Sequence, residues 1–146
     1  MPLNIQQFIA KLHEKGYKVT QQRLAVFELI NSRDDHPTAD QIHKEIKKKY
    51  PTMSLATVYQ ALHLLKEVGL VQELGFNDKS SRYDPNIMPH INIVCLNCGK
   101  IYDYEAESVK KMWSKIVAEL RFKPVGQRLD IYGYCDECSK EKDSEF

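Results

Sequence analysis

Apolar residues in the first half of the chain recur with the period of an α-helix. Four of them follow the spacing i, i+3, i+4, i+7, which places side chains on one helix face: Ile5, Phe8, Ile9 and Leu12. Thr20, Thr38 and Ser54 each precede a further apolar series, and their hydroxyls can accept hydrogen bonds from the N–H groups at a helix start. The pattern therefore predicts four helices between residues 5 and 68.

After Gly69 the pattern becomes that of strands. Residues 70–74 and 81–84 predict two short strands around a polar turn at residues 77–80. Four helices followed by such a hairpin predict a winged helix-turn-helix, a DNA-binding fold. We expect this domain to occupy residues 1–84.

The remainder of the chain predicts a smaller α/β domain at residues 85–146. Alternating apolar positions indicate strands at residues 91–95, 100–104 and 128–134. Residues 108–120 carry apolar side chains along one helix face, and the polar residues 139–146 are expected to be frayed. The fold class is thus α+β. Because so small a domain has room for only a limited core, a metal ion or a dimer partner would help to stabilise it.

Every cysteine in the chain lies in a Cys-x-x-Cys pair: Cys95 with Cys98, and Cys135 with Cys138. Two such pairs supply four thiolates, which is the ligand set of a closed tetrahedral zinc site. Because a closed site leaves no coordination position open, we expect structural zinc rather than catalysis. Two alternatives are a redox dithiol, which would account for one pair only, and four free cysteines that pair by chance.

Charge and composition exclude few classes of protein. The net charge is +1, and the basic excess lies in residues 1–84, where twelve Lys and Arg stand against ten Asp and Glu. This excess is too slight to decide for or against nucleic acid. The N-terminus lacks the basic and apolar regions of a signal peptide, and the apolar runs are far shorter than a membrane span. We therefore expect a cytoplasmic protein with no membrane partner and reduced thiols.

The helix predicted to begin at Ser54 has two different faces. Val58, Leu62 and Leu65 form an apolar stripe, whereas side chains that can meet base edges and phosphates lie opposite. Tyr59 is the strongest indication, because a large exposed aromatic residue needs a partner. The alternative is the solvated face of a core helix. We expect DNA contacts on this helix and on the hairpin from Ser54, Ala56, Thr57, Tyr59, Gln60, His63, Lys79 and Arg82.

Two of the five histidines, His36 and His90, stand outside the predicted helices. His36 precedes a proline and a helix cap, and His90 lies shortly before the first cysteine. Asp84 and Asp103 are each placed at the end of a predicted strand. Two imidazoles and two carboxylates would suit a divalent transition metal such as Fe²⁺ or Mn²⁺.

Six motifs follow one another in the order seen in the Fur family of metalloregulators, which the chain resembles over nearly its whole length. They are His36-Pro-Thr-Ala-Asp40, Ser54-Leu-Ala-Thr-Val-Tyr59, Gly69-Leu-Val71, Ser81-Arg-Tyr-Asp84, Cys95-x-x-Cys98-Gly-Lys100 and Leu129-x-Ile-Tyr-Gly-x-Cys135-x-x-Cys138. The resemblance implies a homodimer that binds palindromic double-stranded operator DNA. It also implies structural Zn²⁺ on the four cysteines and a regulatory Fe²⁺ or Mn²⁺ at the hinge between the domains.

Within this family the chain is most similar to the peroxide-responsive PerR branch, because Asp84 and Asp103 occur where iron-responsive members usually have Glu. By position, the resemblance makes His36, Asp84, His90 and Asp103 four of the five regulatory ligands, and it makes Tyr59 a base-contacting residue. The fifth ligand, a histidine in the family, is Asn92 here. Its amide oxygen is a harder and weaker ligand, which should favour Mn²⁺; alternatively, it leaves a position through which peroxide reaches Fe²⁺.

These observations lead us to expect a metal-dependent DNA-binding transcriptional repressor that senses peroxide or metal status, and not an enzyme. One alternative is an iron- or zinc-responsive regulator of the Fur or Zur type, in which Asn92 reshapes the site. A second is a zinc or thiol oxidoreductase, although the sequence offers no nucleophile–base arrangement for it. A third is a zinc-stapled interaction module without affinity for DNA.

Overall fold

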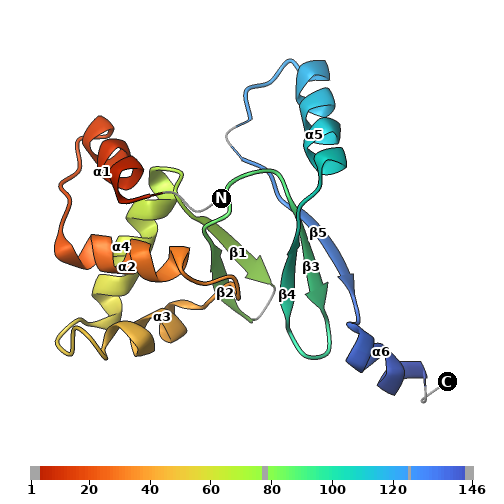
Figure 1. Cartoon of the computed structure of the whole chain (residues 1–146), viewed down its shortest axis with the longest axis horizontal. Helices are drawn as coiled ribbons and strands as arrows, with labels where there is room; N and C mark the ends of the chain where they lie inside the picture. The colour runs from red at the N-terminus through yellow and green to blue at the C-terminus, as the bar shows by residue number, and fades with distance from the viewer. Residues whose placement is uncertain (1–3, 77–78, 125, 144–146) are drawn as a thin grey trace. The chain divides into compact units, whose positions relative to one another are not determined.

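The computed structural model describes residues 4–76, 79–124 and 126–143. The chain divides into two compact units, unit 1 at Met1–Ile87 and unit 2 at Met88–Phe146, each with a sheet of its own (Figure 1). The predicted domain boundary after residue 84 falls at the end of the second strand of unit 1. Asn77 and Asp78 of the predicted hairpin turn lie outside the described residues.

Unit 1 contains four helices and an antiparallel hairpin (Figure 1). The elements are α1 (Ile5–Glu14), α2 (Gln21–Asn31), α3 (Ala39–Ile46), α4 (Leu55–Glu67), β1 (Gln72–Phe76) and β2 (Lys79–Asp84). The predicted hydroxyl caps Thr20, Thr38 and Ser54 each accept a hydrogen bond from a backbone N–H of the helix that follows. The predicted α+β class and winged helix-turn-helix are therefore confirmed.

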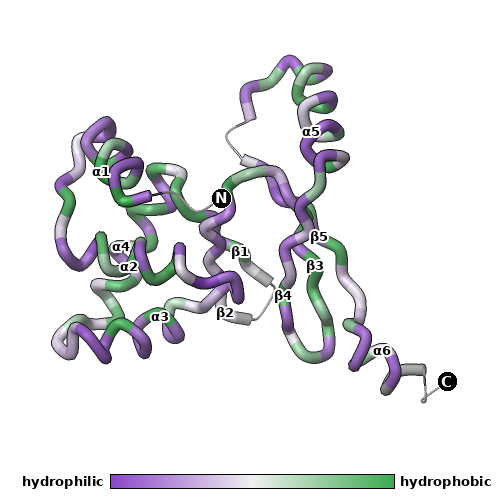
Figure 2. Tube along the Cα trace, viewed as in Figure 1, coloured by the Kyte–Doolittle hydropathy of each residue, from purple (hydrophilic) through white to green (hydrophobic). Residues whose placement is uncertain are grey.

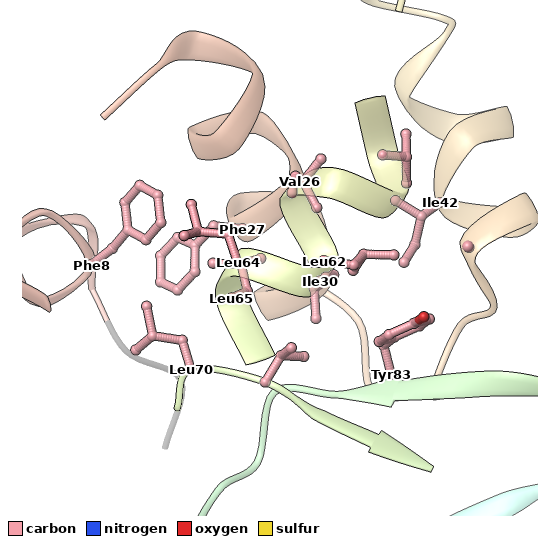
Figure 3. Packing of buried hydrophobic residues seen from close by; sticks show 14 of the residues in the cluster. Phe8, Val26, Phe27, Ile30, Ile42, Leu62, Leu64, Leu65, Leu70 and Tyr83 are labelled. Atoms are coloured by element: carbon pink, nitrogen blue, oxygen red, sulfur yellow. The ribbon is translucent and has the colours of Figure 1, made fainter. Parts of the chain in front are cut away.

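The core of unit 1 is built around α4, which presents its buried side chains to α2, α3 and the hairpin (Figure 3). Leu62 and Leu65 on α4 are 1% exposed, and the ring of Phe8 stacks on that of Phe27 with centroids 4.4 Å apart. Figure 2 shows hydrophobic and hydrophilic residues interspersed along all four helices of unit 1, as the predicted amphipathic stripes require. Packing thus fixes which face of α4 remains outside.

A glycine turns the chain from α4 into the hairpin. Gly69 has φ = 77°, a left-handed conformation that residues with a side chain rarely adopt. The following N–H, that of Leu70, donates to the carbonyl of Leu65 over 2.8 Å, which closes the helix end. Helix α4 and the hairpin are therefore joined by a short, defined turn.

Unit 2 is a three-stranded sheet with two helices. Its elements are β3 (Ile91–Cys95), β4 (Ile101–Tyr104), α5 (Glu107–Glu119), β5 (Leu129–Gly133) and α6 (Asp136–Asp143). The strand order is β4-β3-β5, with β4 antiparallel and β5 parallel to the central strand. Few apolar side chains of this unit are buried, Val94, Ile101 and Val109 among them. A small core of this kind needs a further source of stability.

The end of the chain differs from the prediction. Residues 139–146 were expected to be frayed, but α6 includes residues 139–143. Two acidic residues in its first turn, Asp136 and Glu137, favour the helix because they face the positive end of the helix dipole. The Ser139 N–H also donates to the carbonyl of Cys135 over 2.7 Å. Local charge and the turn at Cys135 thus stabilise a helix that has no apolar stripe.

No helix within the described part of the chain has both the length and the apolar character that a membrane crossing demands.

We expect Leu62→Ala to lower the free energy of unfolding by about 2–5 kcal/mol, because it leaves a cavity at the centre of the core. Gln60→Ala, on the exposed face of the same helix, should change it by less than about 0.5 kcal/mol. Chemical denaturation followed by far-UV circular dichroism measures both. Equal losses for the two variants would contradict the assignment of the faces of α4.

Candidate metal centre and DNA-binding face

The two Cys-x-x-Cys pairs form a single cluster in unit 2. The four sulfur atoms lie within 4.8 Å of one another, and Cys98 Sγ and Cys135 Sγ are 3.9 Å apart. Cys95 ends β3, and Cys135 follows β5. Because β3 and β5 are parallel neighbours, with Cys95 opposite Gly133, the sheet brings the two pairs to the same end.

The electrostatics of this cluster suit a bound cation. The Cys135 N–H donates to Cys95 Sγ over 3.4 Å, and this bond, with those from Cys98 and Asn97, lowers the pKa of Cys95 to about 6. The Asn97 amide lowers the pKa of Cys138, but hydrogen bonding with Cys135, burial and the neighbouring thiols raise it to about 12. The raised pKa of Cys138 means that a nearby cation would be needed to hold this residue as a thiolate at neutral pH. A closed set of four thiolates fits structural zinc.

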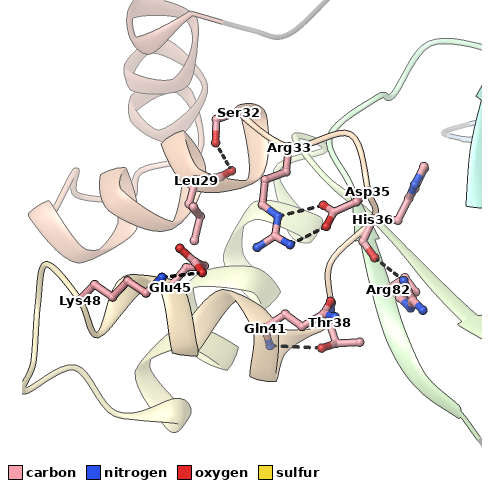
Figure 4. A network of polar contacts seen from close by, with 10 residues as sticks. All are labelled: Leu29, Ser32, Arg33, Asp35, His36, Thr38, Gln41, Glu45, Lys48 and Arg82. Atoms are coloured by element: carbon pink, nitrogen blue, oxygen red, sulfur yellow. Dashed lines mark hydrogen bonds and ion pairs between the residues drawn. The ribbon is translucent and has the colours of Figure 1, made fainter. Parts of the chain in front are cut away.

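In unit 1 a histidine and an aspartate are buried together. His36 is 2% and Asp84 1% exposed, and His36 Nε2 lies 3.3 Å from Asp84 Oδ2. The loop carrying His36 is held to β2, because the Arg82 guanidinium donates to the His36 carbonyl over 3.1 Å (Figure 4). The Tyr83 N–H also donates to the Pro37 carbonyl over 2.9 Å. Two potential metal ligands, both predicted, thus meet beside the wing.

The backbone of His36 adopts φ = 51°, the left-handed region that residues other than glycine seldom occupy. Such a conformation is sustained only where the surrounding structure enforces it, and it is commonest at functional sites. Here the bonds from Arg82 and Tyr83 provide that constraint. No local pattern of residues indicated this backbone conformation.

In unit 2 three ligand atoms converge on one point. His90 Nδ1 lies 2.7 Å from the Met88 carbonyl oxygen, so it carries the proton and donates it there. The other ring nitrogen, Nε2, lies 3.1 Å from Asn92 Oδ1 and 3.5 Å from Asp103 Oδ1, and it is the nitrogen available to a metal bound beside these oxygens. A histidine whose Nδ1–H is given to a backbone carbonyl is in the usual arrangement of a metal ligand. Imidazole, amide and carboxylate form a donor set suited to Mn²⁺ or Fe²⁺.

The direction of the Asn92 amide depends on a residue that the sequence analysis missed. Asn92 is 1% exposed, and its Nδ2 donates to Asp130 Oδ1 over 3.1 Å. The oxygen of the amide is consequently turned toward His90. In the sequence, Asp130 is recognisable only as a polar residue within the strand predicted at residues 128–134. Its role could not be predicted, because no local pattern indicates that β5 pairs with β3.

On α4 the predicted DNA-contacting residues lie on the outside. Tyr59 is 48% exposed, and Ala56, Gln60 and His63 are exposed as well. The hydroxyls of Ser54 and Thr57 lie 3.0 Å apart, and Ser54 also caps the helix. Arg82 donates to the loop of His36, as described above, and the side chain of Lys79 lies outside the described residues.

A winged helix joined to a small sheet unit with a four-cysteine cluster and buried His and Asp groups defines the class of metal-dependent DNA-binding regulators. Residues 14–132 match the model of the ferric uptake regulator family. A peroxide operon regulator from Bacillus subtilis (strain 168) is 40% identical over 138 residues, which are 94% of this chain and 95% of that protein. The chain belongs to the ferric uptake regulator family.

Solved structures agree with this assignment. The structure of PerR from Streptococcus pyogenes, which addresses peroxide sensing and gene regulation, is 31% identical with a TM-score of 0.53, covering 94% of this chain and 95% of that one. The ferric uptake regulator of Helicobacter pylori has a TM-score of 0.75 at 21% identity, covering 95% of this chain and 97% of that one, and shows the common fold. The predicted resemblance to the Fur family and its PerR branch is confirmed.

We expect Cys138→Ser to abolish retention of zinc, because one of four thiolate ligands is lost and a closed site depends on all of them. Ser139→Ala, at the next position, should retain one zinc ion per chain. Metal content after dialysis against a chelator measures this, and circular dichroism reports whether unit 2 keeps its structure. Full retention of zinc by Cys138→Ser would contradict the four-cysteine site.

Proposed function

We propose that the chain is a dimeric, metal-dependent repressor that binds palindromic operator DNA and senses peroxide through a hinge metal. One observation carries the proposal: metal-ligand groups occur in both units, with Asp84 directly before and His90 directly after the segment that connects them, and all of these groups except Asp103 are buried. His36 and Asp84 belong to unit 1, whereas His90, Asn92 and Asp103 belong to unit 2. We further propose that these five groups hold one Fe²⁺ or Mn²⁺ ion between the units.

The position of these residues in the chain explains how metal could control DNA binding. Asp84 is the last residue of β2, and His90 immediately precedes β3. An ion held by both restricts the angle between the DNA-binding unit and the dimerisation unit, and that angle sets the spacing of the two recognition helices in a dimer. Metal binding and operator binding therefore favour each other by the same free energy.

The outer face of α4 supports the DNA-binding part of the proposal. Tyr59 and Gln60 offer a hydroxyl and an amide for base edges, and Ala56 allows close approach of the backbone. The helix N-terminus at Ser54 presents N–H groups suited to a phosphate. Arg82, one of the two hairpin residues proposed to contact DNA, also donates to the His36 carbonyl. The hairpin is thereby connected to a proposed metal ligand.

Exposed apolar side chains in unit 2 support a homodimer. Part of the apolar stripe predicted at residues 108–120 lies open, because Met112, Ile116 and Leu120 are each at least 40% exposed, whereas Val109 is buried. Tyr132 on β5 is 54% exposed. A unit with a small core and this much open apolar surface gains stability by packing against a second copy. Palindromic DNA is the natural target of such a symmetric pair.

The peroxide response is proposed from the resemblance to PerR proteins and from the two retained histidines. Bound Fe²⁺ would supply the electrons that reduce peroxide beside its ligands. The chain contributes the oxidisable imidazoles of His36 and His90, both less than 4% exposed. Their oxidation would remove ligands and free the operator. The four thiols require a reducing compartment, which favours a cytoplasmic location.

A second candidate function, a manganese- or iron-responsive regulator without peroxide chemistry, is favoured by Asn92. Its amide oxygen replaces the imidazole found in the family, and it is already turned toward the other ligands. An oxygen-rich site prefers Mn²⁺ over softer divalent metals, and Mn²⁺ does not reduce peroxide readily.

We expect Asp103→Ala to weaken Mn²⁺-dependent operator binding by about 10-fold or more, to the level of metal-free wild type, because a unit 2 ligand is lost. Tyr59→Ala should weaken DNA binding with and without Mn²⁺ and leave Mn²⁺ affinity unchanged. Fluorescence anisotropy on palindromic DNA selected by the wild type measures both. Asp34→Ala, at an exposed acid, is the control. Unchanged Mn²⁺-dependent affinity in Asp103→Ala would refute the hinge site.

We expect anaerobic Fe²⁺-loaded protein to gain the mass of one oxygen atom at His36 or His90 after one equivalent of hydrogen peroxide. Peptide mass spectrometry locates the modification. His43, whose Nε2 bonds to the Met53 carbonyl at 2.9 Å, should stay unmodified, as should the Mn²⁺-loaded protein. If neither His36 nor His90 gains an oxygen atom, the peroxide sensor is excluded and the metal-responsive function is favoured.

A further inference from the structure

We infer that Asp130 is a positioning residue of the regulatory metal site: it holds the Asn92 amide so that the oxygen, not the nitrogen, faces the metal. Asn92 thereby becomes a direct oxygen ligand in place of the usual histidine. This inference rests on the proposed function, since it concerns the same metal. It adds a residue on β5 that lies outside the proposed ligand set.

The sheet of unit 2 places three polar residues side by side at one level. Asn92 on the central strand is the register partner of Asp103 on β4 and of Asp130 on β5. Direct partners on neighbouring strands project to the same face of a sheet. Asp103 therefore lies on one side of Asn92 and Asp130 on the other, with His90 two residues earlier along the chain.

The hydrogen bonds assign different roles to the two aspartates. Asp130 Oδ1 accepts from Asn92 Nδ2 over 3.1 Å. Asp130 Oδ2 accepts from Arg128 Nε and from the Tyr132 hydroxyl, each over 2.9 Å. Both oxygens of Asp130 are thus engaged by donors from the protein, which suits an orienting group. Asp103 Oδ1 instead faces His90 Nε2 at 3.5 Å, which suits a ligand.

This arrangement selects one of the two orientations of the amide. An ionised carboxylate only accepts hydrogen bonds, so the Asn92 nitrogen must turn toward Asp130. In the opposite orientation the amide oxygen would face the Asp130 carboxylate, and the N–H₂ group would face the cation. Without Asp130 a buried asparagine would lose the constraint that makes it a ligand. A carboxylate that accepts the N–H also makes the amide oxygen a stronger donor to metal.

The test is a double-mutant cycle on the full-length, zinc-loaded protein, with Mn²⁺ affinity measured from the electron paramagnetic resonance signal of the free ion. We expect Asp130→Ala and Asn92→Ala each to weaken Mn²⁺ binding by about 10- to 100-fold. The double variant should be no weaker than Asn92→Ala alone, because Asp130 acts through Asn92. Glu119→Ala, which removes an exposed acid at the end of α5, should stay within about 3-fold of wild type.

Zinc content and circular dichroism establish that each variant is folded. If Asp130→Ala does not fold, Asp130→Leu, which fills the same space without an acceptor, takes its place in the cycle. Unchanged Mn²⁺ affinity after loss of Asp130, or equal further loss in the Asn92→Ala background, would overturn the inference. A wild type that binds Mn²⁺ no better than His90→Ala would overturn the proposed metal site itself.

Discussion

The parallel pairing of β3 with β5 is the contact on which both the four-cysteine cluster and the proposed regulatory ligands of unit 2 depend. At one end of the pair, Cys95 lies opposite Gly133, and the two cysteine pairs meet. Three residues earlier, the same register sets Asn92 beside Asp130. The two strands are far apart in sequence, and few apolar side chains of this unit are buried. A zinc ion bound at the ends of the strands would therefore also stabilise the register that aligns the proposed regulatory ligands. If both ions bind as proposed, loss of the zinc would also disturb the regulatory ligands.

In unit 1, hydrophobic packing positions the proposed functional residues. A conventional hydrophobic core surrounds α4, and this core fixes both the exposed face of α4 and the position of β2. Arg82 and Tyr83 on β2 then hold the loop that carries His36 in its left-handed conformation. A group that contacts DNA and a group that binds metal would therefore share one rigid support. Coupling between distant sites needs such a contiguous connection.

Much of this could be predicted from local sequence signals. The hydroxyl caps at Thr20, Thr38 and Ser54 act within one helical turn, and paired cysteines reveal a metal site whatever the fold around them. Asp130 could not be found in the same way, because its role arises from a pairing between strands 38 residues apart. The strain at His36 and the helix α6 were missed for a related reason. Each depends on hydrogen bonds and charges that a periodic apolar pattern does not record.

Asn92 is the proposed ligand at which the chain departs from the histidine that the family resemblance implies. An imidazole in that position would bind metal without assistance, whereas an amide needs a partner to decide which end it presents. The account as a whole claims that one metal, held by ligands from both units, favours the DNA-binding arrangement. The most direct measurement is the Mn²⁺ affinity of the protein with and without operator DNA. The account predicts that DNA tightens Mn²⁺ binding by the same factor by which Mn²⁺ tightens DNA binding; equal Mn²⁺ affinity in the two states would contradict it.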